Sequence, residues 1–131
     1  MNAQLLVAGS LSLLAAAVHG IEGEVLVVRR LTPTGLPSSP FGGPGTTRDM
    51  IRATWHMTTI GFLTVGVALV LSGSFMHGDI GRGAGLVAAA AATGFAGIAM
   101  VGAVRSPRAI VRHPAPVLLI VIAVLAWSGI L

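Results

Sequence analysis

The chain has no cysteine, no lysine and no tyrosine, and only 9% of its 131 residues are charged. Without cysteine, structural disulfides, iron–sulfur ligation and thiol chemistry are excluded, so any metal ion must be held by His, Asp, Glu or backbone oxygen. A soluble domain carries roughly a quarter charged residues. Here hydrophobic residues make up 54% and the mean hydropathy is +0.90. This composition predicts a protein whose solvent is the lipid bilayer.

Four segments are apolar on all sides and approach the length of a membrane span. A helix needs about 20 residues to cross a hydrocarbon core about 30 Å thick. The sequence therefore predicts an all-α integral membrane protein, a single four-transmembrane-helix bundle with spans over residues 4–28, 50–72, 85–104 and 116–131. The fourth span is short. Residues 31–47 are rich in Pro, Gly, Ser and Thr and are predicted to form an irregular cytoplasmic loop.

The arginines predict the orientation of the spans. Three groups of them lie near the span ends: Arg29, Arg30, Arg48 and Arg52 around the first loop, Arg82 in the second, and Arg105, Arg108 and Arg112 in the third. By the positive-inside rule, the first and third loops are cytoplasmic and both termini are on the outer side. The net charge of +4 is therefore a topology signal and does not indicate nucleic-acid binding.

Ionisable side chains inside membrane spans are costly and by default mark a functional site. The first two predicted spans contain His19, Glu22, Glu24 and His56, besides Arg52. Counted inward from the arginines at the span ends, His19 and His56 lie about 15 and about 12 Å deep, and Glu24 and Arg52 about 8 and about 6 Å deep. The sequence thus predicts two level pairs on consecutive antiparallel helices.

Helical periodicity predicts which of these side chains share a face. Two stripes follow from the spacing: Asp49, Arg52, His56 and Thr59 on the second span, and Ser12, Ala16, His19, Glu22 and Gly23 on the first. Glu24 projects more than a quarter-turn away from the second stripe. We therefore expect His19, Glu22 and His56 to converge, and Glu24 to reach Arg52 only if the first helix is slightly rotated.

Three functions remain open for this set of residues. In the leading hypothesis, haem b or a transition metal ion binds between the first two spans for electron transfer or metal handling. The expected site comprises the ligands His19 and His56, Glu22 or Glu24 as a further ligand or acceptor, Arg52 as charge partner, and Trp55 and Thr59 beside the cofactor. The alternatives are a proton-coupled small-molecule transporter and a structural membrane subunit whose polar pairs only fix helix packing. No nucleophile and base pair favours an enzyme.

The third predicted span has a different character, because it consists mostly of Ala and Gly. Small residues let helix backbones approach closely, and Gly81 and Gly85 have the spacing of such a contact. Four short spans enclose little volume, so we predict a homo-oligomer, most simply a two-fold dimer through this span. Membership of a larger membrane complex also stays open.

Two short motifs carry a resemblance. His19, Gly23 and Glu24 form H-x-x-x-G-E, and the second span holds R-x-x-W-H-x-T, made of Arg52, Trp55, His56 and Thr58. This pairing resembles a family of small bacterial four-helix membrane proteins of uncharacterised function. The resemblance covers the first two spans and their loop, and it implies a role for Glu24 rather than Glu22.

The four spans with an early glutamate are also similar to small multidrug-resistance transporters. The chain departs from that family because it has no lysine after the first span and no Tyr- and Trp-containing stretch in the second.

We predict a bacterial inner-membrane location.

Overall fold

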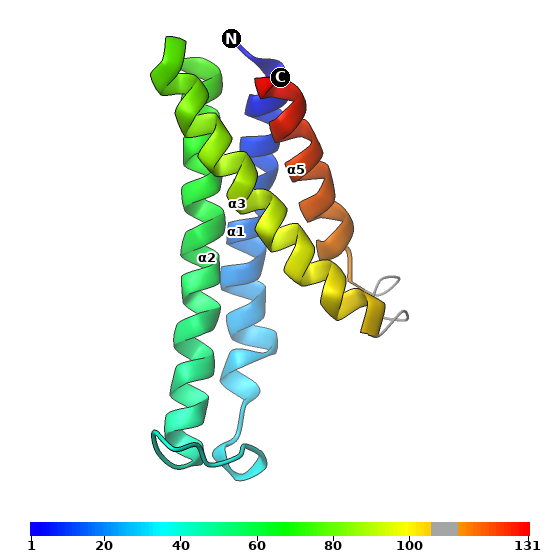
Figure 1. Cartoon of the computed structure of the whole chain (residues 1–131). Helices are drawn as coiled ribbons and strands as arrows, with labels where there is room; N and C mark the ends of the chain where they lie inside the picture. Colours follow the sequence, from blue (N-terminus) through cyan, green and yellow to red (C-terminus); the bar gives the residue numbers. More distant parts are fainter. Residues whose placement is uncertain (106–112) are drawn as a thin grey trace. The chain divides into compact units, whose positions relative to one another are not determined.

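The computed structural model describes residues 1–105 and 113–131 (Figure 1). In these residues it has four α-helices and no β-strand: α1 (Ala3–Leu26), α2 (Pro44–Ser74), α3 (Gly78–Arg105) and α5 (Ala115–Ile130). Two short 3-10 helices, η1 (Val28–Arg30) and η2 (Pro33–Gly35), lie between α1 and α2. The predicted all-helical class is confirmed. Arg108 and Arg112, on which the orientation partly rests, lie outside the described residues.

Three of the described helices are long and apolar enough to cross a membrane. They cover Ala3–Arg30, Pro44–Ser74 and Gly78–Arg105, with 28, 31 and 28 residues. At 1.5 Å per residue, 28 helical residues extend about 42 Å. α5 is also apolar, but its 16 residues extend only about 24 Å, less than the hydrocarbon thickness. The chain therefore has the helices of a membrane protein, with three clear candidate spans and one short apolar helix.

Two helix starts differ from the predicted boundaries. α2 begins at Pro44, inside the segment predicted as loop, because proline is well suited to the first position of a helix. α3 begins at Gly78, seven residues before the predicted start at residue 85. Asp79 lies in its first turn, where the helix dipole favours a carboxylate. The predicted outer loop is thus reduced to a turn over residues 75–77.

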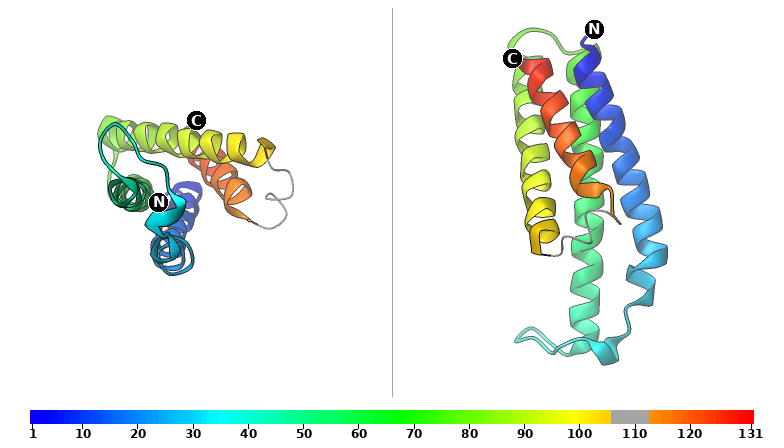
Figure 2. Two further views of the ribbon diagram at one scale, coloured as in Figure 1. Left: turned by 90° about the horizontal axis from the view of Figure 1, so that it is seen from below. Right: turned by 90° about the vertical axis from the view of Figure 1, so that its right-hand side faces the viewer.

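Met1–Ala15 and Phe62–Leu131 form one compact unit. Within it α3 and α5 lie side by side (Figure 2), and both helices bury small residues, with Ala92 and Ala126 almost fully buried. Gly85 also packs inside this unit, since a Cβ on it would lie 3.0 Å from Oγ of Ser72. The small residues of α3, which were predicted to form a contact between two copies, therefore also pack against other helices of the same chain.

Ala16–Gly61 form the second compact unit. In it the last part of α1 and the first part of α2 run antiparallel, because Gly20 faces Thr59 whereas Gly23, further along α1, faces the earlier residue Trp55. A Cβ on Gly20 would lie 2.8 Å from Cγ2 of Thr59, and a Cβ on Gly23 would lie 2.6 Å from Nε1 of Trp55. The two glycines thus permit the close approach of these helix segments and fix their register. All five ionisable residues predicted as functional, Arg52 included, lie in this unit.

Candidate functional site

Glu24 is a buried carboxylate between α1 and α2, with 8% of the residue exposed. Its Oε1 lies 2.9 Å from Nη2 of Arg52 and 3.4 Å from Nε of Arg29. Its Oε2 lies 3.2 Å from Nε2 of His56. One carboxylate is therefore surrounded by two guanidinium groups and one imidazole, and the Arg52 contact agrees with the level pair predicted by depth counting.

Local structure explains how these partners reach Glu24. Arg52 and His56 are four residues apart on α2 and so project from one face of the helix. α1 ends at Leu26, two residues after Glu24. The chain then turns through η1, anchored by Val28, which is 3% exposed. This turn brings Arg29 back beside the carboxylate.

The cationic partners extend from Glu24 towards the surface. The side chains of Arg29, Arg52 and His56 are 68%, 57% and 42% exposed, against 11% for that of Glu24. Long side chains can place an apolar stem along the helices while the charged head stays in a polar region. The arrangement therefore connects a buried negative charge to groups that lie partly on the surface of the helix pair, and the guanidinium groups offset the desolvation of the carboxylate.

The second carboxylate oxygen of Glu24 is buried without a hydrogen bond from the described residues. Oε2 is buried, and no group in residues 1–105 or 113–131 forms a hydrogen bond of acceptable geometry with it. Nε2 of His56 is close enough for an ion pair at 3.2 Å but is not aligned for a hydrogen bond. Buried polar atoms normally have a hydrogen-bond partner, so an exception calls for an explanation, such as a chemical role.

His19 and Trp55 form a second polar group in this unit. Their rings stack with centroids 4.4 Å apart and planes 13° apart, and Nε1 of Trp55 donates to the carbonyl of His19 at 3.0 Å. Oγ1 of Thr59 lies 3.0 Å from Nδ1 of His19 and 3.3 Å from the carbonyl of Trp55. With the single hydroxyl proton of Thr59 donated to that carbonyl, its lone pair accepts from Nδ1–H of His19.

The two groups lie on different flanks of the helix contact. His19 and Glu24 are five residues apart, which is a rotation of about 140° around α1. Trp55 and His56 are neighbours in sequence and differ by about 100° around α2. The structure therefore brings His19 to Trp55 and His56 to Glu24, and does not gather the predicted residues into one site.

Glu22 does not take the place that the stripe analysis predicts. It is exposed, and Glu24 is the carboxylate beside His56. The expected convergence of His19, Glu22 and His56 is therefore wrong, because Glu24 is the carboxylate beside His56 and His19 stacks on Trp55 instead. The physical reason is that α2 packs over Gly20 and Gly23, which rotates α1 so that Glu24 lies at the edge of the contact.

The donor atoms of this unit do not form a metal cluster. Within the described parts of the chain, no group of three or more His, Asp or Glu side chains is close enough to hold a metal ion. The oxygens of Glu24 already face Arg29 and Arg52, whose positive charges would repel a metal cation. The geometry thus gives a metal at Glu24 little support.

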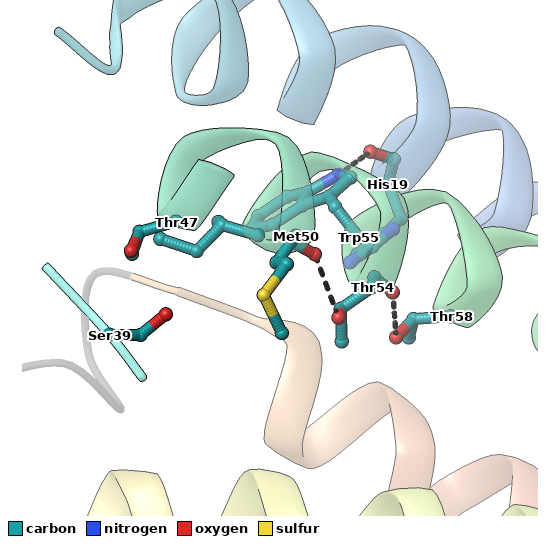
Figure 3. A pocket seen from close by; sticks show the side chains of 8 residues that line it. His19, Ser39, Thr47, Met50, Thr54, Trp55 and Thr58 are labelled. Carbon is teal, nitrogen blue, oxygen red and sulfur yellow. Dashed lines mark hydrogen bonds between the residues drawn. The ribbon is translucent and has the colours of Figure 1, made fainter. Parts of the chain in front are cut away.

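A cavity of about 530 Å³ lies beside the stacked rings. Its walls include His19 of α1 and several α2 side chains, namely Thr47, Met50, Thr54, Trp55 and Thr58 (Figure 3). Sequence analysis predicted His19 and Trp55 beside a ligand between the first two spans, but not the other walls, because the loop residue Ser39 also lines the cavity. The only usable signal was the pair of glycines, which places Trp55 between the helices.

Comparison of the chain with protein-family models, with curated proteins and with solved structures found no match.

Proposed function

We propose that the protein is a proton-coupled transporter of small molecules in a bacterial inner membrane, with Glu24 and His56 as the pair that carries the proton. The observation that supports this most directly is the buried Oε2 of Glu24, which has an imidazole nitrogen 3.2 Å away and no hydrogen bond among the described residues. Carboxylates and imidazoles inside membrane spans are the usual groups of proton relays.

The unequal exposure of the pair supports a direction for proton entry. His56 is partly exposed whereas Glu24 is buried, so the imidazole takes up a proton from water and passes it to the carboxylate. Imidazole is suited to this step because it gains and loses a proton near neutral pH. Once the imidazole turns so that Nε2–H points at Oε2, the proton moves from Nε2 of His56 to Oε2 of Glu24, and His56 becomes neutral again.

The ion pairs of Glu24 with the arginines connect its protonation to the packing of α1 against α2. A neutral Glu24 no longer attracts Arg52 and Arg29, which lie 2.9 Å and 3.4 Å from Oε1. Loss of these ion pairs weakens one side of the contact between α1 and α2. Protonation therefore changes the relative stability of two arrangements of these helix segments, which is what coupling to a transported molecule requires.

The membrane arrangement completes the proposal. α5 acts as the fourth, short span, so both termini lie outside and the arginine-rich first loop lies in the cytoplasm. Two copies associate through the lipid-facing side of α3, where a Cβ on Gly94 or on Gly97 would have no described atom within 4 Å. Small residues with open space beside them allow close helix packing.

The test measures proton movement in reconstituted protein. Proteoliposomes on a solid-supported membrane are exposed to concentration jumps of uncharged amphiphilic alcohols and amides, and protein-free liposomes give the background. We expect a transient current with the natural chain and none with Glu24→Gln. Glu22→Gln is the matched control, since it makes the same chemical change at an exposed position of α1, and it should keep the current.

Two results would overturn the proposal. Either no compound produces a current above background, or Glu24→Gln and Glu22→Gln behave alike. In both cases the ion pairs of Glu24 serve only to fix the packing of the helices.

A further inference from the structure

Neither Glu24 nor His56 lines the cavity beside His19 and Trp55, since the proton pair lies on the other flank of the helix contact. Its volume of about 530 Å³ is within the range of small-molecule sites, which are mostly apolar with a few polar groups. Figure 3 shows the two aromatic rings beside a row of threonines on α2. The chemistry of these walls indicates what the cavity can hold.

The threonine hydroxyls have donated their protons to the backbone. Thr54 donates to the carbonyl of Met50 at 2.9 Å, and Thr58 donates to the carbonyl of Thr54 at 3.1 Å. At the entrance, Thr47 donates to the carbonyl of Pro37 at 2.8 Å. A hydroxyl has one proton and two lone pairs. Each of these oxygens therefore remains available only as a hydrogen-bond acceptor.

The other described residues of the walls carry no formal charge. The described residues that line the cavity include no Arg, Asp or Glu, and the only ionisable one is His19. Met50, Ile51 and Trp55 supply apolar and aromatic surface. An ion would lose its hydration there without gaining a counter-charge from any described wall residue, which is strongly unfavourable. A neutral molecule that offers hydrogen-bond donors meets both the acceptor oxygens and the apolar walls.

We infer that this cavity binds an uncharged amphiphile with an O–H or N–H donor and an apolar ring. The donor bonds to the oxygens of Thr54 and Thr58, and the ring lies against Trp55 and Met50. This inference rests on the proposed function and deepens it by naming the substrate class of the transporter.

The backbone connects this cavity to the proton pair. Trp55 fills the space over Gly23, and each of these residues is followed in sequence by a member of the pair, His56 and Glu24. A ligand that shifts the indole changes the contact at Gly23 and so the distance between Glu24 and His56. Binding and proton transfer are therefore coupled through the contact between Trp55 and Gly23.

The test uses the fluorescence of Trp55. The chain has two tryptophans, so Trp127→Phe leaves Trp55 as the only indole. The probe is para-bromobenzyl alcohol, whose bromine quenches a neighbouring indole, and the control ligand is its methyl ether, which has no donor. We expect saturable quenching by the alcohol and binding about fivefold weaker for the ether, the usual effect of one lost hydrogen bond.

Matched variants identify the acceptors. In the Trp127→Phe background, Thr54→Val combined with Thr58→Val keeps the side-chain shape and removes both oxygens, so binding of the alcohol should weaken about fivefold or more. Thr58→Val alone provides a milder variant in case the double change unfolds the protein. Thr64→Val is the control, because Thr64 lies on the same helix outside this cavity, and it should leave binding unchanged.

Three outcomes would overturn the inference: non-saturable quenching, equal binding of alcohol and ether, or unchanged binding after loss of both threonine oxygens. Failure of the proposed function looks different. If the alcohol binds as expected but no Glu24-dependent current exists, the binding site stands and the transporter proposal falls. If other compounds give that current while the alcohol does not bind, the substrate class is wrong and the transporter proposal stands.

Discussion

Trp55 occupies the space that Gly23 leaves by having no side chain. A Cβ on Gly23 would lie 2.6 Å from Nε1 of the indole, and the same nitrogen donates to the carbonyl of His19. The glycine and the tryptophan of the two sequence motifs therefore form one contact between α1 and α2. The next residue in each motif, Glu24 or His56, belongs to the ion pair. The contact between Gly23 and Trp55 thus positions the carboxylate of Glu24 beside the imidazole of His56.

Gly23→Ala should destabilise the protein by about 1–3 kcal/mol, the usual cost of inserting a methyl group into a filled contact. The indole must move and its bond to the His19 carbonyl weakens. The measurement is thermal unfolding of the detergent-solubilised protein, followed by circular dichroism.

Gly45→Ala is the matched control for this substitution. Gly45 is also a helical glycine, in α2, but a Cβ on it would meet no described atom within 4 Å. Alanine has the higher helix propensity, so this variant should be neutral or slightly stabilised. If both alanines have the same effect, the close approach at Gly23 does not matter to stability.

Arg52→Gln should destabilise the protein more than Arg48→Gln. Arg52 is an ion-pair partner of the buried Glu24 at 2.9 Å, so its loss leaves a buried charge with weaker compensation. Arg29 remains nearby and Arg52 is itself more than half exposed, so the expected loss is only about 1–2 kcal/mol. Arg48 pairs with Asp49 on the surface, where such pairs contribute about 0–1 kcal/mol.

A double-mutant cycle separates the pair from its surroundings. In a Glu24→Gln background, Arg52→Gln should have a much smaller effect on the unfolding temperature than in the natural chain. Equal effects in both backgrounds would show that Arg52 stabilises the protein by some other contact.

The sequence contained enough to predict the helices and one of the two level pairs. Long apolar runs without a polar face can only be satisfied as helices in lipid, and depth counting placed Arg52 beside Glu24. It did not predict the rotation of α1, because the stripe analysis followed the polar residues, whereas Gly20 and Gly23 decide which face α2 can approach. The start of α3 was also missed, since a glycine-rich segment gives no apolar signal.

Purified protein should show neither a Soret band nor a stoichiometric transition metal. The expectation follows from the site geometry, in which His19 stacks on Trp55 and His56 faces Glu24, so that the two imidazoles belong to different flanks. Optical spectroscopy and elemental analysis of the detergent extract check it. A Soret band that His19→Ala or His56→Ala abolishes would instead support haem ligation, and the proton-coupled proposal would have to be given up.

Introduced cysteines should report the topology without background, because the chain has none of its own. Thr34→Cys, in η2, should react with an impermeant maleimide only in inside-out vesicles, since the arginines around this loop favour the cytoplasm. His77→Cys, in the turn before α3, should react only from the outer side. The reverse pattern would contradict the proposed orientation.

Leu131→Cys then decides whether α5 crosses the membrane. With α5 as a fourth span, Leu131 lies on the same side as His77, and the two cysteines should react from the outer side alone. If α5 lies along the membrane surface instead, Leu131→Cys should react from the side of Thr34, because α3 has already returned the chain to the cytoplasm. A 16-residue helix reaches only about 24 Å, so crossing requires the bilayer to thin locally around α5. Reconstitution into lipids with shorter acyl chains should therefore raise the outer-side reactivity of Leu131→Cys relative to longer-chain lipids, while His77→Cys stays constant.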